Sequence, residues 1–254
     1  MSKRARCKTC PFLQEKEIAM LQITALMDDN IPKDPALLNE HGLSFFVQYK
    51  GLHILFDCGM TSAAQENART LDIDLKNLDA VILSHSHYDH AAGFRSLTEN
   101  GLGSSCLYTG PKFFEPKFAW KENRYADLSC GFDSGFLKEN HICHREINGI
   151  SQIHPGMWLI SGFPRIHDFE TIPERFVLKT SQGFEPDAFS DEVCMALEIE
   201  GGLAVLVGCS HPGILNMLSH IQRLLNMPIR AVFGGTHLVE ADANRIETTI
   251  HALQ

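Results

Sequence analysis

Short apolar runs that end in polar or small residues recur along this chain, and each run predicts a buried β-strand. In the N-terminal half the runs are 21–27, 42–49, 52–56, 80–83 and 106–109. In the C-terminal half they are 158–162, 191–200, 203–207 and 229–233. Turn-forming residues separate two pairs of consecutive runs, at Lys50-Gly51 and at Gly201-Gly202, and therefore predict two hairpins.

Other segments carry a helical pattern. Residues 61–70 are polar and alanine-rich, and residues 94–100 are followed by Gly101, a residue common after helix ends. Residues 214–225 place apolar side chains at helical spacing, and residues 240–253 predict a closing helix. Strand-rich halves that are each followed by an amphipathic helix predict a four-layer αββα sandwich of the α/β (α+β) class, with two mixed sheets face to face.

The length of the chain, 254 residues, fits one domain with a single sizeable core. We therefore predict a single domain over residues 1–254, of which residues 1–20 form a loose N-terminal extension. Cys7 and Cys10 form a lone C-x-x-C pair in that extension. Half of a zinc knuckle is the alternative interpretation, but no second pair with matching spacing follows.

Composition narrows the class of protein. A net charge of −9 argues against a nucleic-acid-binding protein, because such proteins carry a basic surplus or stripe. No apolar run approaches the roughly 20 residues that span a bilayer, so we expect no membrane partner. The N-terminus is basic but lacks the apolar segment of a secretory signal. Eight scattered cysteines then favour reduced thiols and a cytoplasmic location.

The most informative stretch follows the apolar run 80–83. After Ser84, the residues His85, His87, Asp89 and His90 can all bind a metal. Side chains two residues apart in an extended backbone leave on the same side, so His85 and His87 can bind one cation while the last two face a second position. Neutral imidazole plus carboxylate suits zinc, iron or manganese and is too nitrogen-rich for calcium or magnesium. A histidine-rich loop without function is the alternative interpretation.

Two later strands also end in small residues followed by histidine. The run 203–207 leads to His211, and the run 229–233 leads to His237. Strand ends converge at one rim of a sheet, so a chain with histidines at three such ends is most simply building one metal site. The cluster 141–144 lacks this context and is interpreted as structural. The aromatic and basic segment 111–128 is either a substrate cover or surface packing, and the sequence does not decide between them.

The order H-x-H-x-D-H, followed by a later strand-end residue and a final strand-end histidine, resembles the metallo-β-lactamase superfamily across nearly the whole chain. The segments 208–214 and 234–238, together with the passage from Gly162 to Glu170, resemble one subgroup of it. That subgroup is the one of the dihydropterin-using ribofuranosyl-aminobenzene-phosphate synthase of methanopterin biosynthesis. The resemblance implies the sandwich fold and a metal-dependent activity.

The chain departs from the superfamily pattern in two places. The usual third motif of the superfamily, a Gly-His-Thr-like turn before the penultimate hairpin, is missing, and Asp191 stands near where it would fall. The usual bridging aspartate is replaced by Cys209, Ser210 and His211. With these departures, the resemblance implies two divalent ions, expected to be zinc, with iron or manganese as alternatives. The predicted ligands are His85, His87 and His211 for one ion and Asp89, His90 and His237 for the other.

Two assignments stay open at this point. One tightly bound ion with a weak second is the alternative to a binuclear site. His211 is the expected replacement for the missing third-motif histidine, with Asp191 bracing a ligand from behind it. The other possibility is that Asp191 fills that position itself. Cys209 is a substrate contact, nucleophile or ligand in one interpretation and a small packing residue in the other.

The chemistry that follows is hydrolysis or group transfer with a metal-activated water or hydroxide. Asp89 would orient that water and take its proton, and Arg165 would contact a small anionic substrate that bears a phosphate or a pterin. A metal-binding sensor without turnover is the alternative, and a redox di-iron protein is a weaker third. The sequence indicates no oligomeric state.

Overall fold

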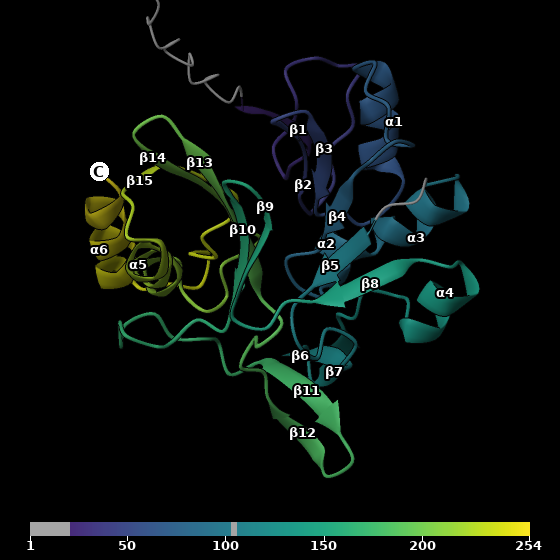
Figure 1. The fold of residues 1–254 in the computed structure, drawn as a ribbon. Coiled ribbons are helices and arrows are strands. Elements are labelled where there is room, and N and C mark those ends of the chain that lie inside the picture. Colours follow the sequence, from purple (N-terminus) through teal and green to yellow (C-terminus); the bar gives the residue numbers. More distant parts are fainter. Residues whose placement is uncertain (1–20, 103–105) are drawn as a thin grey trace, which may run out of the picture.

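Two β-sheets pack face to face between layers of helices in the computed structural model, which describes residues 21–102 and 106–254 (Figure 1). The first sheet has six strands in the spatial order β1-β2-β3-β4-β5-β8. Their bounds are β1 Leu21–Met27, β2 Ser44–Tyr49, β3 Leu52–Phe56, β4 Ala80–Ile82, β5 Cys106–Thr109 and β8 Cys143–Glu146. The pairs among β1, β2 and β3 are antiparallel, whereas β3, β4, β5 and β8 run parallel.

The second sheet has five strands in the order β15-β14-β13-β10-β9. Their bounds are β9 Ile150–His154, β10 Met157–Ser161, β13 Val193–Ile199, β14 Gly202–Leu206 and β15 Ile229–Phe233. Only the β14–β15 pair of this sheet is parallel. The helices are α1 Ala63–Thr70, α2 Tyr88–Ala91, α3 Gly93–Glu99, α4 Ser134–Glu139, α5 Ile214–Leu225 and α6 Ala243–Leu253.

Alternation along the strands produces three apolar layers, because successive side chains of a strand point to opposite faces. In β3, Ile54 and Phe56 enter the core between the two sheets, while Leu55 packs on the opposite face with α1 and α3. In β13, Met195 enters the same inter-sheet core, and Cys194 packs towards α5. The arrangement of helix, sheet, sheet and helix confirms the predicted four-layer αββα sandwich.

A third sheet was not predicted. It has four antiparallel strands in the order β12-β11-β6-β7, and it extends below the sandwich in Figure 1. Their bounds are β6 Lys117–Lys121, β7 Arg124–Asp127, β11 Phe176–Thr180 and β12 Gly183–Pro186. These strands have four or five residues each, and every residue of β12 is exposed. Without a long apolar run, they leave no clear strand signal in the sequence.

Four further expectations concern the chain beyond this core. The interpretation of Cys7, Cys10 and the extension 1–20 lies outside the described residues, and the single-domain assignment stays a prediction. The cluster 141–144 lies at the start of β8, where His144 Nε2 is 2.9 Å from Thr109 Oγ1. Within 21–102 and 106–254, no helix is long and apolar enough to cross a membrane.

Candidate metal centre

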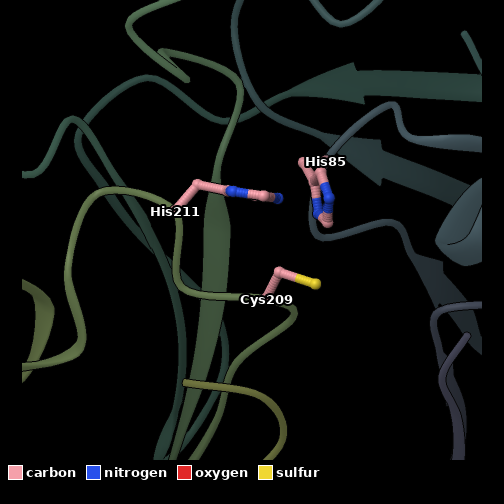
Figure 2. A group of neighbouring side chains, drawn as sticks. All are labelled: His85, Cys209 and His211. Carbon is pink, nitrogen blue, oxygen red and sulfur yellow. The ribbon is translucent and has the colours of Figure 1, made fainter. Parts of the chain in front are cut away.

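Three strand ends meet at one rim of the sandwich, as predicted from the sequence. The loop after β4 brings His85 and His87, the loop after β14 brings Cys209 and His211, and the loop after β15 brings His237. Because β14 and β15 are parallel, their carboxyl ends lie at the same edge of the second sheet. Figure 2 shows Cys209 and His211 extending from one loop towards His85 on the facing loop.

The two loops of the second sheet are joined to each other by hydrogen bonds. Gly235 N donates to Gly208 O at 2.7 Å, and Ser210 Oγ donates to Gly235 O at 2.7 Å. A side chain at Gly234 would place its Cβ 1.9 Å from Val207 O, and Gly234 has a φ of 124°. Only glycine permits this close approach, so the chain positions the loops of Cys209 to His211 and of Gly235 to His237 together.

Asp57 fixes the loop that follows β4. Its fully buried carboxylate accepts hydrogen bonds from Ser84 N at 2.7 Å and Ser84 Oγ at 2.8 Å, and it lies 2.7 Å from His90 Nδ1. A buried carboxylate is stable only with such partners, and here the partners are the first and last parts of the histidine motif. Sequence reasoning missed this role, because the sequence marks Asp57 only as the polar residue that follows the predicted strand 52–56.

His90 is held at both ring nitrogens. Nδ1 faces Asp57, and Nε2 lies 3.0 Å from Cys209 Sγ. Burial disfavours the charged imidazole, but the contacts with Cys209 and Asp57 outweigh this effect and hold the pKa of His90 well above its usual value. A carboxylate behind a histidine orients the ring and raises its basicity, as it does behind metal ligands.

The pKa values of the other histidines in the centre shift in the opposite direction, downwards. Burial lowers the pKa of His85, of His87 and of His211 well below the usual value. The next cause is the proximity of other histidines for His85 and His211, and the charge of Lys117 for His87. Burial also lowers the pKa of His237. The ring centroids of His85 and His87 each lie 4.9 Å from that of His211, and the centroid of His237 lies 4.3 Å from it. These imidazoles are therefore neutral at pH 7, the form that binds metals.

Several nitrogens in this cluster have no hydrogen-bond partner within the described part of the chain. They are the Nε2 atoms of His85, His87 and His237 and both ring nitrogens of His211. Unpaired buried polar atoms are unfavourable, so a concentration of them at one point indicates a ligand that pairs with them. The donor set of neutral imidazole, carboxylate and thiol fits zinc, iron or manganese. The residues present therefore fit the metal that the resemblance implies.

The donor atoms fall into two groups that share one residue. In each group the atoms lie within 4.8 Å of one another: His85, Cys209 and His211 in one, and Asp89, His90 and Cys209 in the other. The predicted division into His85, His87, His211 and Asp89, His90, His237 differs from this arrangement. His237 lies beside His211, and Cys209 stands between the groups. Which residues bind each ion stays a prediction.

Asp191 lies behind the histidine loop. Its Oδ2 accepts a hydrogen bond from Ser86 N at 2.9 Å, and its Oδ1 lies 3.0 Å from Lys117 Nζ. Lys117 also pairs with Asp187 at 2.5 Å, and all three charged side chains are buried. Burial alone would lower the pKa of Lys117, but the charges of Asp191 and Asp187 outweigh it and raise the pKa. This buried ion-pair network supports the backbone between His85 and His87.

Two phenylalanines from the third sheet and its following loop form an apolar wall beside the histidines. The ring of Phe189 stacks on that of His211, with centroids 3.9 Å apart and an interplanar angle of 15°. The ring of Phe176 lies 5.5 Å from His87 and 5.7 Å from His237. We call this part of the centre the closed side; it comprises His85, His87, His211 and His237 with Phe176 and Phe189. No local sequence signal indicated the two phenylalanines.

The opposite part faces a cavity of about 220 Å³. We call it the open side, and it comprises Asp89, His90 and Cys209. Glycines 208, 234 and 235 form part of the wall, and Asp28, Asp29 and His41 lie at the rim. His41 Nε2 lies 3.3 Å from Asp89 Oδ2, and the His41 side chain is 63% exposed. A small molecule can therefore reach the centre past Asp89.

Arg165 lies away from the cavity and half-buried. Its Nη1 donates to Pro212 O, and burial lowers its pKa. Nearby, the Glu170 carboxylate accepts from Leu215 N and Asn216 N and so caps α5. The predicted anion contact of Arg165 is untested, and its observed contact is with the loop that carries His211.

Arg175 is a second arginine near the centre, and sequence reasoning did not single it out. Its guanidinium lies 4.0 Å from the centroid of the Phe176 ring, and its Nε is 2.7 Å from Glu240 Oε1. The side chain is 34% exposed. Through Phe176, this cationic group lies beside the closed side while remaining accessible to solvent.

Comparisons with known proteins agree with this geometry. The family model described as the metallo-beta-lactamase superfamily matches residues 39–120. The chain is 29% identical to the 7,8-dihydropterin-6-methyl-4-(beta-D-ribofuranosyl)-aminobenzene-5'-phosphate synthase of Methanocaldococcus jannaschii, over 92% of this chain and 83% of that protein. It is 28% identical to the uncharacterized protein MJ0448 of the same organism, over 83% of this chain and 78% of that one.

A solved structure is also similar over most of its length. The crystal structure of Tm1679, described as a metal-dependent hydrolase of the beta-lactamase superfamily, superposes with a TM-score of 0.75. The sequences are 28% identical, and the match covers 92% of this chain and 83% of that one.

Proposed function

Because this chain belongs to the metallo-beta-lactamase superfamily by sequence match and by fold, we propose that it is a metal-dependent enzyme that hydrolyses or transfers an anionic, phosphate- or pterin-bearing small molecule. The observation that carries the proposal is the cluster of buried histidine nitrogens that have no partner within the described residues, next to the donor group of Asp89, His90 and Cys209. Two divalent ions bound there would supply Lewis-acid polarisation of the substrate and a water of lowered pKa.

Asp89 is the proposed proton acceptor. Its Oδ2 lies 3.3 Å from His41 Nε2 and 3.7 Å from His90 Nε2, and the residue borders the cavity. A carboxylate in this position can orient an incoming water or hydroxyl group and take its proton. His41 is largely exposed, so it can carry that proton onward to solvent. If water enters the cavity the result is hydrolysis, and if a second substrate enters the result is transfer.

The proposed substrate class rests on two observations. The relative named as a dihydropterin ribofuranosyl-aminobenzene-phosphate synthase supports a substrate that carries a phosphate or a pterin. Arg175 supplies an accessible cation beside the centre, and a guanidinium binds phosphate or carboxylate oxygens through paired hydrogen bonds. We therefore propose Arg175 as the anion contact, with Arg165 supporting the loop of His211 through Pro212.

The test of enzymatic function starts with protein purified without chelator. Its metal content is measured by elemental analysis, and turnover is then followed with bis(p-nitrophenyl) phosphate. Asp89→Asn should lower turnover by about 100-fold or more, since a positioned acid or base contributes roughly 10²–10⁴-fold. Asp72→Asn, on an exposed turn residue, is the matched control and should leave turnover unchanged.

A metal-binding sensor is the competing function, and the same experiment separates it. A sensor would bind metal to full occupancy and would turn over neither phosphodiesters nor carboxyl esters. Loss of metal in Asp89→Asn together with loss of activity would leave the proton-acceptor role without support.

A further inference from the structure

The edge of the first sheet carries a pair of cysteines that the metal centre does not use. Cys106 in β5 and Cys143 in β8 are direct partners in the parallel register, and their Sγ atoms lie 2.8 Å apart. Cys143 is exposed, and Cys106 is partly buried. We propose that Cys106 and Cys143 form a thiol–disulfide exchange site, which low-molecular-weight disulfides convert reversibly into an intramolecular disulfide.

The backbone geometry suits this bond. Neighbouring strands lie about 4.8 Å apart, and a disulfide joins Cα atoms about 4.4–6.8 Å apart. In-register residues on adjacent parallel strands also point to the same face of the sheet. The register continues with Tyr108 opposite Arg145 two residues further on, so the pairing on this face is regular. The bond can therefore form without displacement of either strand.

The two sulfurs differ in environment. Cys143 is exposed on the edge strand, and Arg145 on the same strand gives its sulfur a cationic hydrogen-bond partner. Accessible cysteines beside an arginine are typical attacking thiols. Burial, together with the hydrogen bond to Cys143, raises the pKa of Cys106 to about 11. Cys106 therefore keeps its proton until Cys143 has reacted, and acts second.

The exchange proceeds in two balanced steps. The thiolate of Cys143 attacks one sulfur of a disulfide such as oxidised glutathione, forms a mixed disulfide and releases one glutathione thiolate. The thiolate of Cys106 then attacks the Cys143 sulfur and releases the second glutathione. The two protein thiols are oxidised by two electrons, the external disulfide is reduced to two thiols, and the two protons pass to the released glutathione.

The other described cysteines lack such a neighbour. Burial raises the pKa of Cys58, of Cys130 and of Cys194, which disfavours the reactive thiolate at each. Cys209 belongs to the metal centre. Among the described cysteines, only Cys106 and Cys143 have their sulfurs in contact.

The cross-link would close a loop that reaches the centre. The segment between Cys106 and Cys143 contains β6 and β7, and Ser129 within it forms a β-bridge with His87. Closing a loop of this length restricts the unfolded chain, so the oxidised protein should have a thermal midpoint several degrees higher than the reduced protein.

The experiment uses the full chain in a Cys7→Ser, Cys10→Ser background. Reduced, metal-loaded protein is incubated with oxidised glutathione, quenched with acid, alkylated and mapped by mass spectrometry. We expect a cross-link between Cys106 and Cys143 that dithiothreitol releases, and a thermal midpoint raised by several degrees. Cys106→Ser should retain glutathione on Cys143 as a mixed disulfide, and Cys143→Ser should form neither product.

Cys130→Ser is the matched control and should cross-link like the parent. Persistent glutathione on Cys143 with no cross-link in the parent would overturn the proposal. So would a cross-link that forms only in denaturant, or modification that is no faster at Cys143 than at Cys130. None of these readouts depends on metal-dependent turnover, so the outcome is separate from that of the proposed enzymatic function.

Discussion

On the closed side of the centre, His85, His87 and His211 lie against the Phe189 ring, with nitrogens that no protein group pairs within the described residues. On the open side, His90 is already held at both nitrogens, by a carboxylate and by a thiol. A cation bound by these nitrogens displaces no hydrogen-bond partner among the described residues. One entering the open side has to displace the contact between His90 and Cys209. We therefore expect the closed side to bind its ion first and more tightly.

The largest expected effect concerns His211. His211→Ala should lower the metal content per chain as much as His85→Ala does, because both donors belong to the closed side. Asp191→Asn should retain more metal, with an affinity loss of about 10–100-fold, since Asp191 acts through Ser86 N. Elemental analysis at increasing metal concentration makes the measurement. Full occupancy in His211→Ala would contradict the comparison between the two sides.

The second prediction concerns the support behind the closed side. Lys117→Met should lower the free energy of unfolding by about 3–5 kcal/mol, because it leaves the buried carboxylates of Asp187 and Asp191 uncompensated. Lys121→Met, at the exposed end of the same strand, should change it by no more than about 0.5 kcal/mol. Urea unfolding of the metal-free variants measures both. Equal stability of the two variants would show that the network does not support the fold.

The third prediction tests Cys209, the open-side residue whose sulfur belongs to both groups of donor atoms. Cys209→Ser should weaken the open side more than the closed side, because it replaces a soft sulfur ligand with a hydroxyl, and the open side has one histidine where the closed side has four. In cobalt-substituted protein, the thiolate-to-cobalt absorption should disappear while one ion per chain remains bound. Unchanged absorption in the variant would remove Cys209 from the ligand set.

The fourth prediction is a pH dependence of the free energy of unfolding of the metal-free protein. Burial lowers the pKa of His85, His87 and His211, so below about pH 6.5 the unfolded chain binds more protons than the folded one. The free energy of unfolding should therefore fall on acidification, by up to about 1.4 kcal/mol per pH unit for each such histidine. Chemical unfolding between pH 7 and 5 measures this dependence. The free energy of unfolding should change less with pH in His211→Gln than in the wild-type protein.

The contribution of His90 to the pH dependence of the free energy of unfolding has the opposite sign. Its raised pKa contributes stability that is fully present below about pH 6.5 and is lost as pH rises through the folded-state pKa. Asp57→Asn removes the charge of one of the two partners of His90 and should reduce this contribution, while the contact with Cys209 remains. If the free energy of unfolding of the wild-type protein rises on acidification, the contribution of His90 outweighs that of His85, His87 and His211.

The predicted elements that match the structure most closely are those with strong periodic signals. The strands 21–27, 52–56, 106–109 and 229–233 and the helix 214–225 have the observed bounds. The third sheet was missed because its strands are short and partly or wholly exposed, so they bury too little apolar surface to leave a pattern.

The candidate site also has one part that the sequence predicts and another that only the fold reveals. The histidine motif is local, so its place at a strand end could be inferred from sequence spacing alone. Asp57, Lys117 and Phe189 are single residues brought in from distant segments, and only the tertiary fold reveals them. The grouping of His237 beside His211 also depends on backbone geometry, since His237 adopts a φ of 44° that sequence spacing does not reveal.

The hydrogen bonds that join the two loops of the second sheet have a mechanical consequence. Ser210 and Gly235 hold these loops together, so Cys209, His211 and His237 keep a fixed arrangement. His85 and His87 follow a strand of the other sheet, where Asp57 ties their loop to β3. The same loop is also tied to the second sheet, because Val193 N donates to Ser84 O and Ser86 N donates to Asp191 Oδ2. Hydrogen bonds within each half and between the two halves thus fix the spacing of the ligand-bearing loops, and the site is preorganised for its ions.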